Sequence, residues 1–431
     1  MGNASTQQTI DAIRSAGQPL VIFGASIVGE LLLRICRREQ LAVDCFCDND
    51  THKTGQALGG IEVLDAKTLR TKYEDAVFLI SAADIGDVID QLHHQGYSKW
   101  FAGGLLLGDV DLAEGELSAP ADFVEYTVGA CITCHENYLN PDKVFLRSVD
   151  VIVTERCSLK CRDCANLMQY YSQPRNCDTE ELLRSIDALC RCVDQINEFR
   201  VIGGEPFMNK DWHVAVKRCL NEPKVKRVVI YTNGTIIPRD EHVEVLKNDK
   251  VLVMATDYGA LSKRIEGLID MLAHHHIAYY RLKAGRWSDC SRIARHGRDP
   301  ERQKAIFRAC CVHNLTTLSD GKLYRCPFAA NADRLGAVPT FAGELVVLPH
   351  AVEEPQDLAE TRKRIRAFLL GKEYLEACDY CEGRSYGAPE IPPAVQTEKP
   401  LHYDRCDAEN LGRSCPVENH AGKVGQGHVH K

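Results

Sequence analysis

The sequence predicts an α/β protein with two units built on parallel sheets, followed by a small unit made of a β-hairpin and a helix. Two stretches in which strand-like and helix-like segments alternate predict the parallel sheets, because parallel strands need long crossover connections. These stretches lie within residues 18–104 and 149–282. A hairpin pattern at residues 315–325 and a helix-like run at residues 357–376 predict the third unit.

Length, charge and composition are those of an ordinary globular chain. Its 431 residues suffice for two or three domains, each with its own core. The net charge of −8, without a long basic run, argues against nucleic acid as an obligate partner. Because no apolar stretch reaches transmembrane length and no signal-peptide pattern is present, we expect a cytoplasmic protein without a membrane span, beginning with a flexible segment at residues 1–17. The 20 cysteines are then expected to be metal ligands, catalytic thiols or core residues rather than disulfides.

The first unit, residues 18–130 with its connector, contains a degraded dinucleotide-binding fingerprint. After a buried-strand pattern, Gly24, Ser26 and Gly29 occupy the three positions of G-x-G-x-x-G. Asp48 follows the second strand, where a ribose-binding carboxylate would lie. These four residues are candidates for nucleotide binding at a helix N-terminus, and a scaffold or docking domain without a ligand is the alternative. The region resembles Rossmann-like domains found beside enzymes of surface-sugar and polysaccharide assembly.

The junction between the two units, residues 105–147, contains a C-x-x-C-H motif, formed by Cys131, Cys134 and His135. This motif attaches haem in exported cytochromes, and nothing in this sequence indicates export. We therefore expect a packed connector whose thiols are structural.

The second unit contains five strand candidates, with helices between them. They are residues 149–154, 198–202, 228–232, 251–256 and 277–282. The clearest helix begins at Asp178, a good N-cap, with Glu181 completing a capping box. A parallel sheet carries its site at the C-terminal ends of the strands, and three cysteines with C-x3-C-x2-C spacing follow the first strand. Three thiolates are one too few to close a four-iron cluster or a tetrahedral zinc site, so a metal held there would keep an open position.

Three motifs at successive strand ends resemble the signature of the radical S-adenosylmethionine (radical SAM) superfamily. They are the loop with Cys157, Cys161 and Cys164, the segment Gly203, Gly204, Glu205 and Pro206, and the turn Thr232, Asn233 and Gly234. A coincidental zinc loop is the alternative for the first motif, but it would not account for the other two. The residue before the third cysteine is usually aromatic in the family and is Asp163 in this chain.

The resemblance implies a partial parallel (β/α)6 barrel over residues 131–300 and a [4Fe–4S] cluster held by the three cysteines. SAM would chelate the fourth iron, and an electron from a flavodoxin or ferredoxin would cleave it to a 5′-deoxyadenosyl radical that abstracts hydrogen from the substrate. The residues implied to contact SAM are Gly203, Gly204, Glu205, Pro206, Thr232 and Asn233.

A second cysteine set, within residues 301–390, resembles the twitch auxiliary-cluster module, a shorter relative of the SPASM module. It comprises Cys311, Cys326, Cys378 and Cys381, and Cys310 fits the spacing as well as Cys311 does. The resemblance implies a second, fully ligated [4Fe–4S] cluster, and a structural zinc ribbon is the alternative. Cys406 and Cys415, in the C-terminal tail at residues 391–431, are candidates for a substitute ligand.

An auxiliary cluster beside a radical site implies either oxidation of the substrate or, with a thiol that returns a hydrogen atom, epimerisation. Cys290 is a candidate hydrogen donor, as is whichever of Cys310 and Cys311 is free, and an ordinary loop thiol is the alternative for Cys290. Polar residues near the strand ends are expected to face a polar substrate or to form a solvated rim: Asp257, Tyr258, Arg281, Lys283, Arg286 and Asp289.

The nucleotide-binding-like first unit favours a sugar, sugar nucleotide or cyclitol as the substrate class. A ribosomally synthesised peptide is the alternative substrate. A non-enzymatic iron–sulfur or zinc protein is the alternative of a different class.

Overall fold

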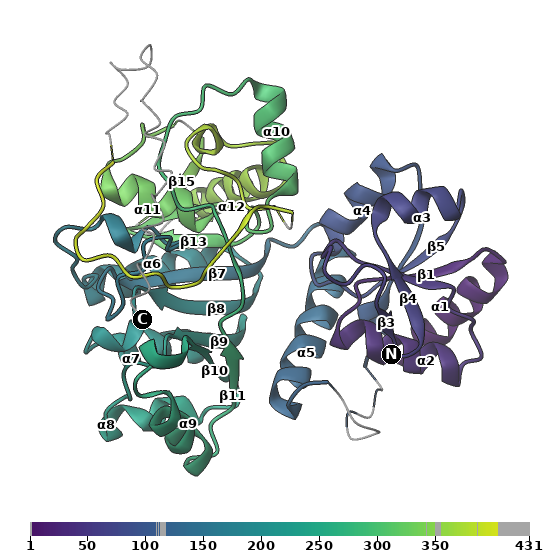
Figure 1. Ribbon diagram of the computed structural model, residues 1–431, viewed down its shortest axis with the longest axis horizontal. Coiled ribbons are helices and arrows are strands. Elements are labelled where there is room, and N and C mark those ends of the chain that lie inside the picture. The colour runs from purple at the N-terminus through teal and green to yellow at the C-terminus, as the bar shows by residue number, and fades with distance from the viewer. Residues whose placement is uncertain are drawn as a thin grey trace, which may run out of the picture.

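The computed structural model describes residues 2–108, 110, 112, 118–341, 343–349, 355–385 and 387–403. Figure 1 shows two α/β units side by side, with helix α5 (Ala121–Tyr138) between them. Two cysteines considered above, Cys406 and Cys415, lie outside the described residues. Among the helices of the described ranges, none combines the length and the apolar character needed to cross a membrane.

The first unit is a doubly wound sheet in the order β3-β4-β2-β1-β5-β6, as predicted. Five strands are parallel, and only the edge strand β3 is antiparallel among those described. The strands are β1 (Leu20–Phe23), β2 (Cys45–Cys47), β3 (Ala57–Leu58), β4 (Ile61–Leu64), β5 (Val77–Ile80) and β6 (Lys99–Ala102). Helices α1 (Gly2–Ala16), α2 (Ile27–Arg38) and α5 cover one face, and α3 (Ala66–Lys72) and α4 (Ile85–His94) cover the other.

The N-terminal segment differs from the expectation of a flexible start. Residues 2–16 form helix α1, in which Ile10 and Ile13 are buried. These two residues lie three positions apart, on one face of the helix, and pack into the core beside α2. Because the residues around them are mostly polar, two apolar positions were too few to predict a helix from the sequence.

The C-x-x-C-H motif lies on α5, where both cysteines and His135 are buried. The backbone N–H of Gly104 donates to His135 Nδ1 at 3.0 Å, so His135 Nε2 carries the proton and donates to the carbonyl of Ala82 at 2.8 Å. Burial lowers the pKa of His135 to about 4. The histidine therefore joins α5 to the first sheet as a neutral side chain, in keeping with a packed connector.

The second unit is an eight-stranded sheet in the order β11-β10-β9-β8-β7-β13-β14-β15. The five predicted strands are β7 (Phe145–Thr154), β8 (Gln195–Gly203), β9 (Val225–Thr232), β10 (Val251–Asp257) and β11 (Tyr279–Lys283). All are parallel, which confirms the partial barrel. The sixth parallel strand comes from the predicted hairpin, because β13 (Thr316–Ser319) pairs with β7. Strands β14 (Lys322–Tyr324) and β15 (Leu345–Val347) continue the sheet in antiparallel fashion.

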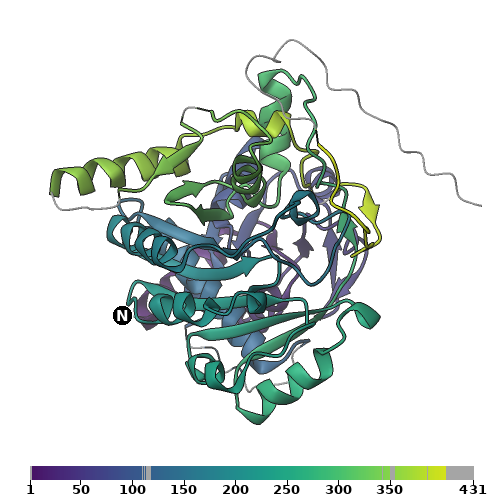
Figure 2. The ribbon, with the colours of Figure 1, turned by 90° about the vertical axis from the view of Figure 1, so that its left-hand side faces the viewer.

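Helices α6 (Thr179–Cys192), α7 (Trp212–Leu220), α8 (Asp240–Val243) and α9 (Ile265–His274) cover the outer face of this sheet. The lower part of the inner face is covered by α5, whose Phe123 stacks on Tyr280. The upper part is covered by the third unit (Figure 2). That unit contains α10 (Pro300–Ala309), α11 (Pro327–Leu335), α12 (Pro355–Leu370) and the 3-10 helix η6 (Glu376–Asp379).

Candidate active site

The first cysteine loop leaves the C-terminal end of β7. Asn233 Nδ2 donates to the sulfur of Cys157 at 3.6 Å, and Gln396 Nε2 donates to the sulfur of Cys161 at 3.4 Å. Burial raises the pKa of all three thiols, that of Cys161 to about 11. Buried thiols of this kind stay protonated at neutral pH and lose the proton when a metal binds them.

The paired glycines at the end of β8 seat this strand against the cysteine loop. A Cβ on Gly204 would lie 2.2 Å from the carbonyl oxygen of Arg156 and 2.7 Å from Cβ of Cys157. Gly203 has a φ of 155°, and a Cβ on it would lie 2.2 Å from the carbonyl oxygen of Thr154. No other residue type fits these two positions without moving the loop.

Glu205 joins the second and third motifs. It is fully buried and accepts hydrogen bonds from Thr232 Oγ1 at 2.9 Å, from the N–H of Asn233 at 2.8 Å and from the N–H of Phe207. Desolvation raises its pKa to about 7, and the groups that oppose this rise are hydrogen-bond donors without charge. A buried carboxylate with neutral partners fits a site that receives the ammonium group of a ligand. Pro206, which follows Glu205 in the chain, is buried as well.

Most of the polar residues expected to face the substrate form ion pairs at the rim of the barrel. Arg281 pairs with Asp257 at 2.6 Å and with Glu266 at 2.7 Å. The other pairs are Arg286 with Glu390 and Asp289 with Arg292, while Lys283 is exposed. Asp163 pairs with the neighbouring Arg162 at 2.9 Å.

Tyr258 differs from the other residues of the rim. It is partly buried, and desolvation raises its pKa; the thiols of Cys161, Cys164 and Cys157 are close enough to raise the pKa further. Its ring meets Trp287 edge-on at 5.9 Å. Tyr258 is therefore the rim residue that adjoins the first cysteine loop.

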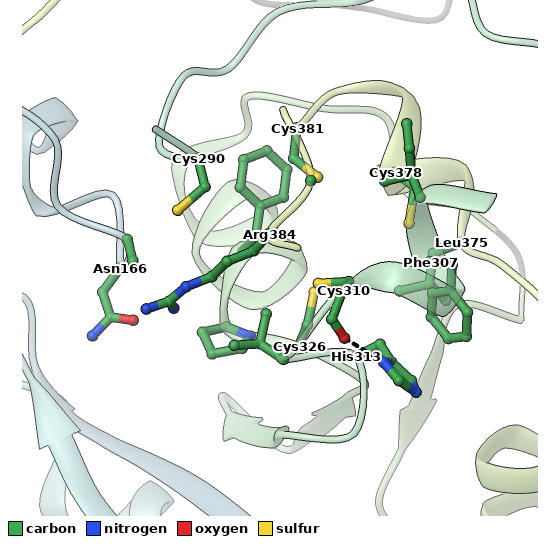
Figure 3. A pocket seen from close by; sticks show the side chains of 16 residues that line it. Asn166, Cys290, Phe307, Cys310, His313, Cys326, Leu375, Cys378, Cys381 and Arg384 are labelled. Atoms are coloured by element: carbon green, nitrogen blue, oxygen red, sulfur yellow. Dashed lines mark hydrogen bonds between the residues drawn. The ribbon is translucent and has the colours of Figure 1, made fainter. Parts of the chain in front are cut away.

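The second cysteine set surrounds one pocket (Figure 3). Its members come from four positions: Cys310 at the end of α10, Cys326 at the start of α11, Cys378 in η6, and Cys381 beyond it. Cys311 is exposed and does not line the pocket, so the geometry favours Cys310 between the two alternatives. The sulfur of Cys326 accepts the N–H of Ala329 at 3.5 Å, and the start of a helix stabilises a thiolate.

The shape of this pocket bears on which metal group fits it. The pocket holds about 590 Å³ of space between atoms, its open mouth included. Across the described ranges, no three His, Cys, Asp or Glu side chains gather closely enough around one point to hold a single metal ion. Four thiols that line one pocket are enough to ligate a four-iron cluster completely, and the same number would satisfy a tetrahedral zinc ion.

The same pocket reaches the first cysteine loop. Ala165 and Asn166, directly after Cys164, line it together with Cys290 and Arg384. Figure 3 shows the Arg384 guanidinium extending toward Asn166, with the Cys290 sulfur on that side of the pocket. No described carboxylate forms an ion pair with Arg384. Its positive charge favours the ionised form of the thiols of Cys164, Cys290 and Cys310 and so partly offsets the effect of their burial. Neither Arg384 nor Asn166 belongs to a motif, so sequence reasoning missed both.

The candidate nucleotide-binding residues are engaged by their own chain. A Cβ on Gly24 would lie 2.3 Å from Ser81 Oγ, and one on Gly29 would lie 2.1 Å from the carbonyl of Gly24. The Asp48 carboxylate accepts from the N–H of Ala25 at 2.8 Å and from Lys53 at 2.9 Å. Ser26 caps α2 without a side-chain hydrogen bond. These contacts build the loop itself, and nucleotide binding remains a prediction.

Two family models match the chain. Residues 151–266 match the radical SAM superfamily, and residues 3–101 match the C-methyltransferase C-terminal domain. Among curated proteins, GTP 3′,8-cyclase of Clostridium acetobutylicum is 27% identical over 142 residues, which are 28% of this chain and 43% of that protein. Molybdenum cofactor biosynthesis protein 1 of Drosophila melanogaster is 34% identical over 93 residues, 21% of this chain and 16% of that protein. The chain thus spans less than half the length of these relatives.

Solved structures with similar folds include BtrN in complex with AdoMet and 2-DOIA. That match has a TM-score of 0.35 and 18% identity, and covers 59% of this chain and 97% of BtrN. Streptococcus suis SuiB bound to S-adenosylmethionine matches with a TM-score of 0.26 and 14% identity, over 40% of each chain.

Proposed function

Because the chain is an enzyme of the radical SAM superfamily, we propose that it abstracts a hydrogen atom from a C–H bond of a sugar, sugar nucleotide or cyclitol and oxidises or epimerises that carbon. When bound, SAM and a [4Fe–4S] cluster supply the 5′-deoxyadenosyl radical that such chemistry requires. Cys157, Cys161 and Cys164 would hold this cluster. The Glu205 carboxylate would accept hydrogen bonds from the ammonium group of SAM. Thr232 and Asn233, which donate to this carboxylate, would hold it in position.

The observation that carries the proposal is the pocket that the second cysteine set lines together with Ala165 and Asn166, the residues directly after Cys164. Asn166 of the first loop lies across the pocket from Cys310, Cys326, Cys378 and Cys381. A substrate bound on the Asn166 side of this pocket would lie between the SAM site and a cluster held by the four thiols, which could accept an electron. Arg384, whose guanidinium has no described carboxylate partner, would donate hydrogen bonds to hydroxyl, carboxylate or phosphate oxygens.

Cys290 distinguishes the two outcomes. In an epimerisation its S–H would return a hydrogen atom to the substrate carbon, leaving a sulfur radical that needs one electron and one proton to regenerate the thiol. In an oxidation the substrate radical would give one electron to an oxidised cluster held by the second cysteine set, and a proton would leave the substrate. Burial raises the pKa of Cys290, so the thiol keeps its hydrogen at neutral pH.

The test uses the full-length chain reconstituted with iron and sulfide. We expect about eight irons per chain, from two four-iron sites, and conversion of SAM to 5′-deoxyadenosine with dithionite, abolished in Cys157→Ala. Zinc without iron, or no 5′-deoxyadenosine, would overturn the radical function.

The substrate class is tested with a panel of nucleoside diphosphate sugars, cyclitols and GTP, the last because one curated relative, GTP 3′,8-cyclase, is named for it. In D₂O, deuterium in recovered sugar that disappears in Cys290→Ala indicates epimerisation, and a carbonyl product indicates oxidation. A panel in which no compound is altered while a ribosomal precursor peptide is modified would overturn the substrate class alone.

A further inference from the structure

The C-terminal end of the described chain lies along the first cysteine loop. The N–H of Arg162 donates to the carbonyl of Val395 at 2.7 Å, and the N–H of Thr397 donates to the carbonyl of Lys160 at 2.7 Å. The two segments therefore run antiparallel, with Cys161 opposite Gln396. We call residues 394–403 the clasp.

Contacts at both ends fix the clasp in place. Before it, strand β16 (Glu390–Ile391) pairs with β12 (Trp287–Ser288). At its end, the N–H of Leu401 donates to the carbonyl of Gln169 at 2.8 Å. Tyr403 donates to the carbonyl of Leu335 at 2.8 Å, and its ring meets Tyr170 edge-on. The clasp thus spans from the rim of the barrel to the third unit.

The side chain of Gln396 makes the closest contact with the cysteine loop. Its Oε1 accepts the N–H of Lys160 at 2.8 Å, which requires the amide nitrogen to lie on the other side. That nitrogen donates to the Cys161 sulfur at 3.4 Å and to the carbonyl of Ala394 at 2.7 Å. The orientation of the amide is therefore set by a backbone donor.

We propose that the clasp holds the cysteine loop in its ligand-ready shape and that Gln396 is a positioning residue for Cys161. The amide N–H favours negative charge on the sulfur, as hydrogen bonds to cluster sulfurs do when they raise a reduction potential. The role of Gln396 rests on the proposed function, since it requires Cys161 to be a cluster ligand. The clasp itself rests only on contacts between described residues.

The first test measures the clasp without iron. Thr397→Pro removes the N–H that bonds to Lys160, whereas Thr397→Val removes only a hydroxyl that bonds to the carbonyl of Lys399. The full-length apoprotein is pulse-labelled with iodoacetamide, and Cys161 labelling is compared with that of the exposed Cys311 by mass spectrometry. We expect a rise of about tenfold in Thr397→Pro, because the loss of a hydrogen bond and its neighbours shifts an opening equilibrium by about 1.4 kcal/mol. No rise in Thr397→Pro, or an equal rise in Thr397→Val, overturns the clasp.

The second test addresses Gln396 in the reconstituted holoprotein. Gln396→Leu keeps the backbone bonds of the clasp and removes the donor to Cys161. We expect a lower reduction potential of the first cluster by EPR-monitored titration, with Thr397→Val unchanged. An unchanged potential in Gln396→Leu overturns the positioning role even if activity falls. A chain without iron at the first loop overturns the proposed function and this role together, and apoprotein labelling still decides the clasp.

Discussion

Arg334→Met should be among the most destabilising single substitutions in the third unit. Arg334 lies on α11, eight positions after Cys326, and its side chain is 4% exposed. Its guanidinium pairs with Glu155, which is 5% exposed and lies two positions before Cys157. A second branch contacts Asp320 in the turn of the hairpin. The substitution therefore leaves a buried carboxylate beside the first cysteine loop.

The size of the effect follows from the partners that remain. Removing one member of a buried ion pair costs about 3–5 kcal/mol, because the other charge stays desolvated. Glu155 would keep the N–H of Arg175 at 3.0 Å, whereas the side chain of Arg175 is 3.9 Å away and largely exposed. We therefore expect a loss near the lower limit, about 3 kcal/mol.

The measurement is urea unfolding of the full-length apoprotein, followed by near-UV circular dichroism. Arg184→Met is the matched control, since Arg184 pairs with Glu181 on the exposed face of α6, and it should leave the midpoint unchanged. Adding Glu155→Gln to Arg334→Met should recover part of the loss, because the orphaned charge is removed. A midpoint for Arg334→Met that equals the control would refute the reasoning.

Three further predictions concern single positions. Gly204→Ala should lower iron loading of the first loop, since its Cβ would overlap the backbone before the first cysteine, whereas Gly129→Ala, whose Cβ meets nothing within 4 Å, should load normally. His135→Asn should flatten the pH dependence of stability. The wild type should lose up to about 3 kcal/mol of unfolding free energy as pH falls from 6.5 to about 4, because the unfolded histidine binds a proton that the buried one does not. Parallel curves of urea midpoint against pH for the two proteins would contradict this. Cys310→Ser should remove about four of eight irons and Cys311→Ser none; equal losses would exclude the assignment of Cys310.

The strands were predictable because buried parallel strands form apolar runs that end at turn residues. The predicted end of β7 at residue 154 is the observed one, while its start at Phe145 was placed four residues late. The missed part includes Arg147, whose charge is balanced by Asp84 of the first unit at 2.9 Å. A charged residue whose ion-pair partner lies in another unit cannot be recognised as part of a buried strand from the hydrophobic pattern of its neighbours.

The same limit separates the residues of the candidate site that the sequence could predict from those that it could not. Cys157, Cys161 and Cys164 lie within eight consecutive residues, so their spacing carries the information. Gln396 lies 235 positions from the cysteine it contacts, and Arg334 lies 179 positions from Glu155. Such contacts depend on the completed fold, and the residues that make them have ordinary neighbours in the sequence.

The open side of the sheet explains why the second cysteine set lies beside the residues that follow Cys164. Ile152 and Ile202 point to the inner face and are buried against Phe307 and Leu375 of the third unit. In a closed barrel, further strands would cover these positions. Here the cover is the unit that carries the second cysteine set, and the strand that extends the sheet belongs to its hairpin. Burying the apolar inner face therefore also brings the four thiols to the mouth of the barrel, beside a loop more than 140 residues earlier in the chain.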